Sequence, residues 1–111
     1  GLSNGARSGL TGFVAGVARQ PQLAGRGVTI NNILPGSFDT DRLKQGFRAN
    51  AAKAGLSAEE LADRRRVQVP AQRFGTPAEF GELCAFLCSL QAGYITGQNL
   101  LIDGGAYPGT Y

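Results

Sequence analysis

The sequence predicts an α/β fold in which two parallel strands are joined by a long helical crossover. Residues 27–34 are almost continuously apolar, as is typical of a parallel strand covered on both faces. Residues 99–103 have the character of a second strand, which a pair of glycines ends. Helical periodicity or helix-capping residues mark three segments between them. Two parallel strands do not make a stable sheet alone, so the chain is expected to be the end of a larger α/β domain.

Composition indicates one modest globular domain. The chain has 111 residues, of which 42% are hydrophobic and 17% charged, and this excludes a disordered or collagen-like protein. The net charge is +3, but the basic run 64–66 has acidic neighbours and no interleaved aromatic residues. A solvated helix end is therefore favoured over a nucleic-acid site. No apolar segment reaches membrane-spanning length, no signal peptide is visible, and methionine is absent even at position 1, so the chain is expected to be a piece of a longer protein.

The first segment, from Ser3 to about Arg19, has two helical faces. One is an apolar stripe made by Leu10, Phe13, Val14, Val17 and Ala18. Ser3 and Arg7 project on the same side and extend this buried stripe toward the N-terminal end. The other face carries Gly5, Gly9, Gly12 and Gly16, each of which costs about 1 kcal/mol relative to alanine in a helix interior. We expect this face to allow the close approach of another backbone, such as a neighbouring subunit's helix; the alternative is a weak helix that packing supports.

A predicted loop over residues 21–27 leads into the first strand, and two helices follow it. The first of these spans 41–54 and ends at Gly55. Its apolar side is formed by Leu43, Phe47 and Ala51. The segment Ser57-Ala-Glu-Glu60 is a capping box, which predicts a second helix running to about Arg66.

The segment Thr76-Pro-Ala-Glu79 predicts the start of another helix, with Pro77 at the first helical position. Its expected core face consists of Phe80, Leu83, Cys84 and Leu87. Cys84 and Cys88 are one helical turn apart, which is the wrong geometry for a strain-free disulfide. Because the chain has no histidine and no further cysteine, no metal site is predicted. We expect free, buried thiols in a reducing, cytoplasmic setting.

The end of the first strand is the candidate binding site. In open α/β sheets, ligands bind beyond the carboxyl ends of the strands, and Pro35-Gly36 lies at such an end. Gly36 lets the backbone approach a flat ligand ring. Thr40 offers a hydroxyl and, near a helix start, a free N–H for a phosphate or carboxamide.

Three motifs in this order strongly resemble the C-terminal part of the short-chain dehydrogenase/reductase family: VTINNILPGSFDT, QRFGTPAEFGELCAFLCS and YITGQNLLIDGG. The matching positions are Asn32, Pro35, Gly36, Thr40, Arg73, Gly75, Pro77, Glu79, Thr96, Gly97, Asp103, Gly104 and Gly105. The resemblance covers nearly the whole chain. It implies that residues 1–111 are the C-terminal part of a single NAD(P)-binding, Rossmann-like, doubly wound domain, namely its last two strands and flanking helices, with the N-terminal half absent.

The resemblance also implies an activity. Members of the family are NAD(P)-dependent oxidoreductases, which move a hydride between nicotinamide and a small-molecule carbonyl or alcohol, with NAD or NADP as cofactor. Pro35, Gly36, Phe38 and Thr40 match the segment that lies against the nicotinamide end of the cofactor, and residues 41–66 match the helices that cover substrate. A cytoplasmic homo-oligomer, dimer or tetramer, is expected, with neither a nucleic acid nor a membrane as partner.

The resemblance breaks at the family's Tyr-x-x-x-Lys motif. Aligning Arg7-Ser-Gly-Leu10 with the family's Lys-Ala-Gly-Leu puts Ser3 at the catalytic tyrosine and Arg7 at the lysine. A serine hydroxyl is a weaker acid than a phenol and is shorter, so Ser3 is a poor proton donor. Arg7 keeps the positive charge and can bind ribose hydroxyls, but it does not deprotonate. Two hypotheses stay open: a reductase with a substitute acid, or with a proton from substrate and water; and a non-catalytic member that binds dinucleotide or serves as an assembly subunit.

Overall fold

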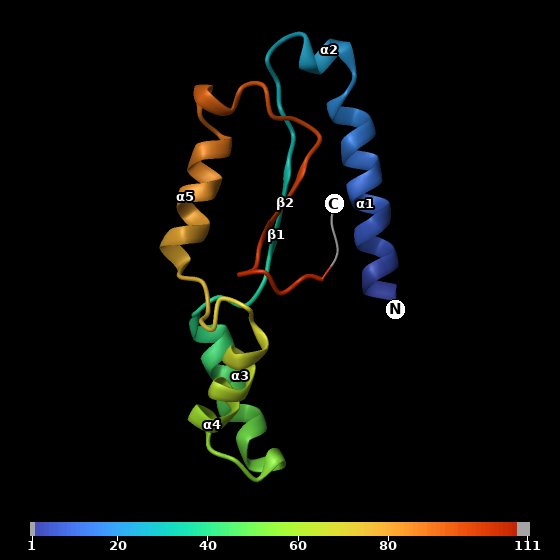
Figure 1. Cartoon of the computed structure of the whole chain (residues 1–111). Coiled ribbons are helices and arrows are strands. Elements are labelled where there is room, and N and C mark those ends of the chain that lie inside the picture. The colour runs from blue at the N-terminus through green and yellow to red at the C-terminus, as the bar shows by residue number, and fades with distance from the viewer. Residues whose placement is uncertain (1, 109–111) are drawn as a thin grey trace. The chain divides into compact units, whose positions relative to one another are not determined.

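The computed structural model describes residues 2–108, with side chains from residue 9 onward. Its elements, in chain order, are α1 (Leu2–Ala18), α2 (Pro21–Ala24), β1 (Asn32–Pro35), α3 (Asp41–Ala54), α4 (Ala58–Gln68), α5 (Pro77–Leu87), the 3₁₀ helix η1 (Leu90–Ala92) and β2 (Asn99–Ile102) (Figure 1). The chain divides into two compact units. One contains Gly1–Leu34 and Glu82–Leu100, and the other contains Pro35–Gly81 and Leu101–Tyr111.

Strands β1 and β2 form the two-stranded sheet, and they are parallel (Figure 1). At one end of the pair the Asn32 N–H donates to the Gln98 carbonyl (2.9 Å), and at the other the Gly36 N–H donates to the Ile102 carbonyl (3.0 Å). The two bonded residues have the same separation in the sequence in both bonds, which is the pattern of a parallel pair. The predicted α/β class, the parallel pairing and the helical crossover between the strands are confirmed.

The first strand begins later than predicted, at Asn32 instead of residue 27. Residues 21–27, predicted to be a loop, contain the short helix α2 with Pro21 at its first position. The chain leaves this helix through Gly27, which has a φ of 78°, and the Val28 N–H donates back to the Leu23 carbonyl (3.1 Å). Residues 27 and 28 therefore belong to the turn that follows α2 and not to the strand.

A side chain replaces part of the ladder just before β1. The Asn31 Oδ1 accepts from the Gln98 N–H (3.1 Å), and its Nδ2 donates to the Ile95 carbonyl (3.0 Å). The Ile30 N–H donates to the Thr96 hydroxyl oxygen (3.1 Å). Together with one backbone bond, in which the Gly97 N–H donates to the Ile30 carbonyl (2.8 Å), these side-chain bonds hold the approach to the strand in place.

The helices of the crossover form where their capping residues predict. The hydroxyl of Thr40 caps α3 by accepting from the Leu43 N–H (3.2 Å), and Gly55 ends it in the left-handed region at a φ of 68°. Ser57 and Glu60 make both bonds of the capping box that starts α4. Helices α3 and α4 pack against each other (Figure 1).

Burial differs from the sequence expectation in two helices. In α1, Ala18 is fully buried, but Leu10 and Phe13 are 59% and 70% exposed, so within residues 10–18 the predicted buried stripe is fully buried only at its C-terminal end; Ser3 and Arg7 lie outside the residues whose side chains are described. In α5, Leu87 is buried, whereas Cys84 and Cys88 are free thiols that are exposed, so their expected burial is wrong for this chain. The helical periodicity is correct in both helices, but no element of the described chain covers these parts of their apolar faces.

The strands also differ from expectation, because most of their residues are only half-buried instead of covered on both faces.

The glycine face of α1 is also uncovered within the described chain. A Cβ placed on Gly9, Gly12 or Gly16 would meet no atom within 4 Å, so within the described chain no other backbone approaches this face. Gly5 lies outside the residues whose side chains are described.

Candidate functional site

The carboxyl ends of the two strands approach each other closely at Gly36. A Cβ placed on Gly36 would lie 2.7 Å from the Asp103 Cβ and 2.8 Å from its Cα. Real Cβ atoms do not approach backbone so closely, so any side chain at position 36 would push the strand ends apart. The sequence predicts Gly36 as a surface for a ligand ring, and the structure adds a second reason for glycine at this position.

Asp103 is held by its own following turn. Its Oδ1 accepts from the Gly105 N–H (3.0 Å), and its Oδ2 accepts from the Tyr107 N–H (2.9 Å). Gly104 has a φ of 63°, and its carbonyl accepts from the Ala71 N–H (3.0 Å). The Asp-Gly-Gly motif therefore ties the end of β2 to the segment between α4 and α5.

Phe38 pairs with Gly75 and packs against it. The two residues form a parallel bridge, in which the Gly75 N–H donates to the Ser37 carbonyl (3.0 Å) and the Asp39 N–H donates to the Gly75 carbonyl (2.8 Å). A Cβ on Gly75 would lie 2.5 Å from the Phe38 Cε1, so the ring occupies the space that a side chain at 75 would need. The ring also meets Phe80 of α5 edge-on, with centroids 5.7 Å apart. The Arg-x-Gly motif thus fixes the direction of the Phe38 ring.

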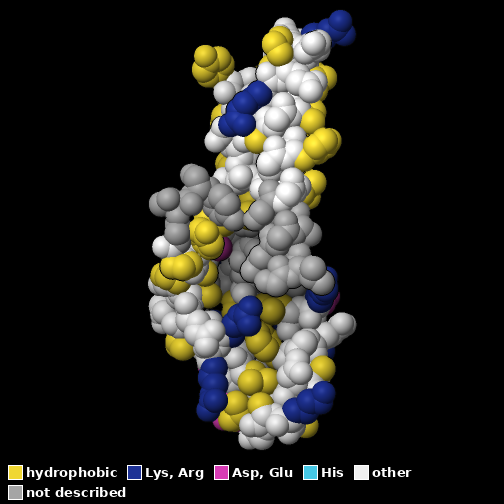
Figure 2. All heavy atoms as spheres, turned by 90° about the vertical axis from the view of Figure 1, so that its right-hand side faces the viewer, with side chains coloured by type: hydrophobic (Ala, Val, Ile, Leu, Met, Phe, Trp, Pro, Cys, Tyr) yellow, Lys and Arg dark blue, Asp and Glu magenta, His cyan; other side chains and the backbone are white. Residues whose placement is uncertain are grey.

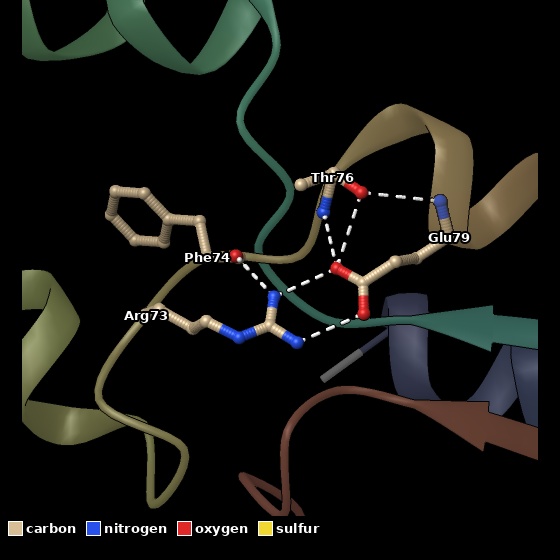
Figure 3. Close-up of polar contacts among 4 residues, drawn as sticks. All are labelled: Arg73, Phe74, Thr76 and Glu79. Atoms are coloured by element: carbon tan, nitrogen blue, oxygen red, sulfur yellow. Dashed lines mark hydrogen bonds and ion pairs between the residues drawn. The ribbon is translucent and has the colours of Figure 1, made fainter.

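The residues on either side of Gly75 form a charged cluster (Figure 3). Arg73 binds Glu79 through two parallel bonds, Nη1 to Oε1 at 2.7 Å and Nη2 to Oε2 at 2.9 Å. The Thr76 N–H donates to Oε1 (2.9 Å), and the Glu79 N–H donates to the Thr76 hydroxyl oxygen (3.2 Å). Glu79 therefore completes the predicted capping box of α5 and also anchors the loop that carries Gly75.

This cluster shifts the acidity of Glu79. The hydrogen bonds from Arg73, followed by the bond from the Thr76 N–H, lower the pKa of Glu79 from 4.5 to about 2. The reciprocal hydrogen bond raises the pKa of Arg73. Glu79 therefore remains a carboxylate in the folded chain well below the pH at which an ordinary glutamate is protonated.

The hydrogen bonds of Thr40 differ from those that the sequence predicts. Its N–H is not free, because it donates to the Phe38 carbonyl (2.9 Å) and closes a tight turn behind that residue. Its hydroxyl oxygen accepts from Leu43 as the cap of α3, which leaves the hydroxyl hydrogen to donate to a ligand. The predicted free N–H at this position is wrong.

A pocket of about 720 Å³ opens beside these residues. It is lined by Pro35, Gly36, Ser37, Phe38, Thr40, Arg42, Leu43, Gly46, Phe47, Asn50, Arg65, Pro77 and Phe80. Four of these, Pro35, Gly36, Phe38 and Thr40, are the residues that the sequence assigns to the cofactor. In Figure 2, hydrophobic side chains gather in the lower part of the face, at the height of α3 and α4 in Figure 1, with Lys and Arg side chains beside them.

The sequence predicted residues 41–66 as a segment that covers substrate, but it did not single out the individual helix residues that line the pocket. Arg42 and Gly46 are four residues apart on α3, so they share one face of that helix and could have been predicted together. Arg65 comes from α4, inside the arginine run that the sequence assigned to a solvated helix end. Phe47 and Phe80 were expected as core residues, and they line the pocket as well.

Comparison with known proteins places the chain in a family. The family model described as Enoyl-(Acyl carrier protein) reductase matches residues 2–107, which is nearly the whole chain. This chain belongs to the short-chain dehydrogenase/reductase family. It is 39% identical over 106 residues to 3-oxoacyl-(acyl-carrier-protein) reductase FabG of Vibrio cholerae, a match that covers 92% of this chain and 36% of that protein.

Solved structures of similar proteins agree with the fold. A family member from Francisella tularensis superposes with a TM-score of 0.81 at 30% identity, over 95% of this chain and 41% of that one. YwfH, an NADPH-dependent reductase involved in bacilysin biosynthesis, superposes with a TM-score of 0.79 at 32% identity, over 93% and 38%. The chain thus spans little more than a third of the length of the curated relative and about two fifths of these structures.

Ser3 and Arg7, which the sequence resemblance assigns to the family's Tyr-x-x-x-Lys motif, fall in α1, where their side chains lie outside the described residues. Among the residues that are described, no group of three His, Cys, Asp or Glu could hold a metal ion. Over the same part of the chain, no helix is long and apolar enough to cross a membrane.

The Glu79 cluster predicts a specific acid dependence of stability. Because the pKa of Glu79 is lowered in the folded state, its contribution is complete above pH 4.5 and is lost as the pH falls from about 4.5 toward about 2. In the full-length protein we expect the difference in unfolding free energy between wild type and Glu79→Gln to be largest above pH 5 and to shrink across this window. Chemical denaturation at a series of pH values measures it.

Glu82→Gln is the matched control, because Glu82 is an exposed glutamate on the same helix and no ion pair involving it is found among the described residues. This variant should follow wild type at every pH. A Glu79→Gln difference that stays constant from pH 6 to pH 3 would contradict the assignment.

Proposed function

We propose that the full-length protein containing this chain is an NAD(P)-dependent oxidoreductase, which transfers a hydride between nicotinamide and a small-molecule carbonyl or alcohol. The observation that carries this proposal is the segment from Pro35 to Thr40, which follows β1 and lines a pocket of about 720 Å³ at the carboxyl end of the sheet. The names of its relatives support it, since one is a 3-oxoacyl-(acyl-carrier-protein) reductase and another an NADPH-dependent reductase.

In this proposal residues 1–111 are the C-terminal part of one NAD(P)-binding Rossmann-like domain. The exposed apolar side chains of α1 and the half-buried strands support it, because these surfaces suit cover by further chain. The open glycine face of α1 is suited to a homo-oligomer contact, in a dimer or tetramer. Free thiols at Cys84 and Cys88 are compatible with a cytoplasmic setting.

The residues at the strand end would bind the nicotinamide end of NAD or NADP, which supplies the hydride when bound. Gly36 lines the pocket and would present its backbone to the ring, and Phe38, fixed by Gly75, would pack against the ring. Thr40 would donate its hydroxyl hydrogen to the cofactor while its oxygen caps α3. Arg7 would bind the ribose hydroxyls.

Proton transfer is the step for which this chain departs from its family. Ser3 stands where the family has its tyrosine, and a serine hydroxyl at that position lacks the acidity and the reach of a phenol. The proton would then come from a group elsewhere in the full-length protein, or from substrate and water. The same two substitutions favour the second candidate function, a non-catalytic dinucleotide-binding or assembly subunit.

The first test concerns the cofactor and uses three variants of Thr40. Thr40→Ser keeps the hydroxyl and the helix cap, and Thr40→Val keeps the shape of the side chain but lacks the hydroxyl. In the full-length protein, we expect Thr40→Ser to bind NAD(P)H like wild type and Thr40→Val to bind about fivefold more weakly, the effect of losing one hydrogen bond of about 1 kcal/mol. Thr40→Ala should lose both affinity and thermal stability.

Fluorescence titration with NADH and with NADPH measures the affinities and also identifies the preferred cofactor. Equal affinity of wild type and Thr40→Val would show that the Thr40 hydroxyl does not contact the cofactor. Absence of binding for both cofactors to the wild-type protein would overturn the proposed function itself.

The second test concerns the proton donor. Ser3→Ala should change carbonyl reduction little, because serine is not an effective acid. Ser3→Tyr combined with Arg7→Lys should raise turnover, since general acid catalysis typically supplies roughly 10²- to 10⁴-fold. A hundredfold loss of turnover in Ser3→Ala at unchanged cofactor affinity would prove Ser3 catalytic and contradict this interpretation.

A further inference from the structure

The pocket beside β1 has an apolar wall made of aromatic rings. Phe38 and Phe80 contribute an edge-to-face pair, with centroids 5.7 Å apart, and both line the pocket. Phe47 of α3 lines it as well, and its ring stacks on the buried ring of Phe74 with centroids 5.9 Å apart. These rings are held by their neighbours, so they offer a preformed apolar surface for the body of a ligand.

Two guanidinium groups from different helices line the same pocket. Arg42 comes from the first turn of α3, and Arg65 comes from the last turns of α4. Neither has an ion-pair partner within the described part of the chain, and none of the described lining residues is acidic. The pocket therefore carries positive charge that nothing in its own lining neutralises.

Two other arginines of the described chain do have carboxylate partners. Arg66, next to Arg65, is paired with Asp63 and lies over the Phe74 ring, with its Cζ 5.1 Å from the centroid. Arg73 is paired with Glu79 through two hydrogen bonds. Successive side chains on a helix point about 100° apart. Arg66 therefore packs on Phe74, while Arg65, at another angle around α4, lines the pocket.

We propose that this pocket binds a carbonyl substrate with an apolar body and an anionic group, carboxylate or phosphate, which Arg42 and Arg65 bind together. The proposal rests on the proposed function and adds the substrate class. The apolar body would pack on Phe47 and Phe80, next to the nicotinamide end that Phe38 contacts. A planar guanidinium forms paired hydrogen bonds with either kind of anion, and two such groups from different helices fix its position.

The experiment compares charged and neutral substrates that share one carbonyl. The carboxylate pair is 4-oxo-4-phenylbutanoate and its methyl ester. The phosphate pair is acetoacetyl-coenzyme A and the neutral thioester S-acetoacetyl-N-acetylcysteamine. The variants Arg42→Gln and Arg65→Gln are made in the full-length protein, with Arg48→Gln on α3 and Arg64→Gln on α4 as matched controls, because these two exposed arginines do not line the pocket.

Each pocket variant should lower kcat/KM for the charged member of at least one pair by about tenfold or more, mainly through KM, and leave its neutral member within about twofold. Loss on the carboxylate pair or the phosphate pair identifies the anion. The control variants should match wild type on all four substrates. Equal losses on charged and neutral members, or no loss in either pocket variant, would overturn the proposal.

A direct measurement of ligand binding distinguishes a failure of this proposal from a failure of the proposed oxidoreductase function. If the protein oxidises no NAD(P)H with any substrate, calorimetric titration of 4-oxo-4-phenylbutanoate and acetoacetyl-coenzyme A, each against its neutral partner, still tests the arginines. Preferential binding of an anion that Arg42→Gln and Arg65→Gln abolish would support the site while the oxidoreductase function fails. Binding without preference for the anion, or no binding, would refute the site.

Discussion

At the carboxyl ends of β1 and β2 the two backbones come so close that position 36 has no room for a side chain. A Cβ there would fall 2.8 Å from the Asp103 Cα, an atom that cannot move away without moving the strand. Asp103 is itself fixed, because both of its carboxylate oxygens accept backbone N–H groups of the following turn. This contact therefore fixes where the chain leaves the ends of β1 and β2, including the start of the turn that leads to α3.

From that contact the candidate site is built by a short series of backbone pairings. Beyond Gly36 the chain pairs with Gly75, and Phe38 takes the space that a side chain at 75 would fill. The loop around Gly75 is in turn anchored by the Arg73–Glu79 pair, which also caps α5. The family's Pro-Gly, Arg-x-Gly and Asp-Gly-Gly motifs thus have one structural purpose in this chain, which is to place a defined surface at the end of the sheet.

The sequence was sufficient to predict those features that a few neighbouring residues determine. The bounds of α3 follow from Thr40 and Gly55, and the strand-end rule identified the segment from Pro35 to Thr40 as pocket-lining. Features that depend on distant parts of the chain were not predictable. The late start of β1 reflects Asn31, whose side chain bonds to residues near β2, and the role of Arg65 depends on how α4 packs against α3.

The most direct test of the strand-end contact is the stability of Gly36→Ala in the full-length protein, with Gly81→Ala as control. Gly81 lies inside α5, and a Cβ placed on it would meet no atom within 4 Å, so alanine there should stabilise the protein by up to about 1 kcal/mol. Gly36→Ala should instead destabilise it by about 1–3 kcal/mol, because backbone must move to make room. Denaturant unfolding that finds Gly36→Ala as stable as wild type would contradict the account.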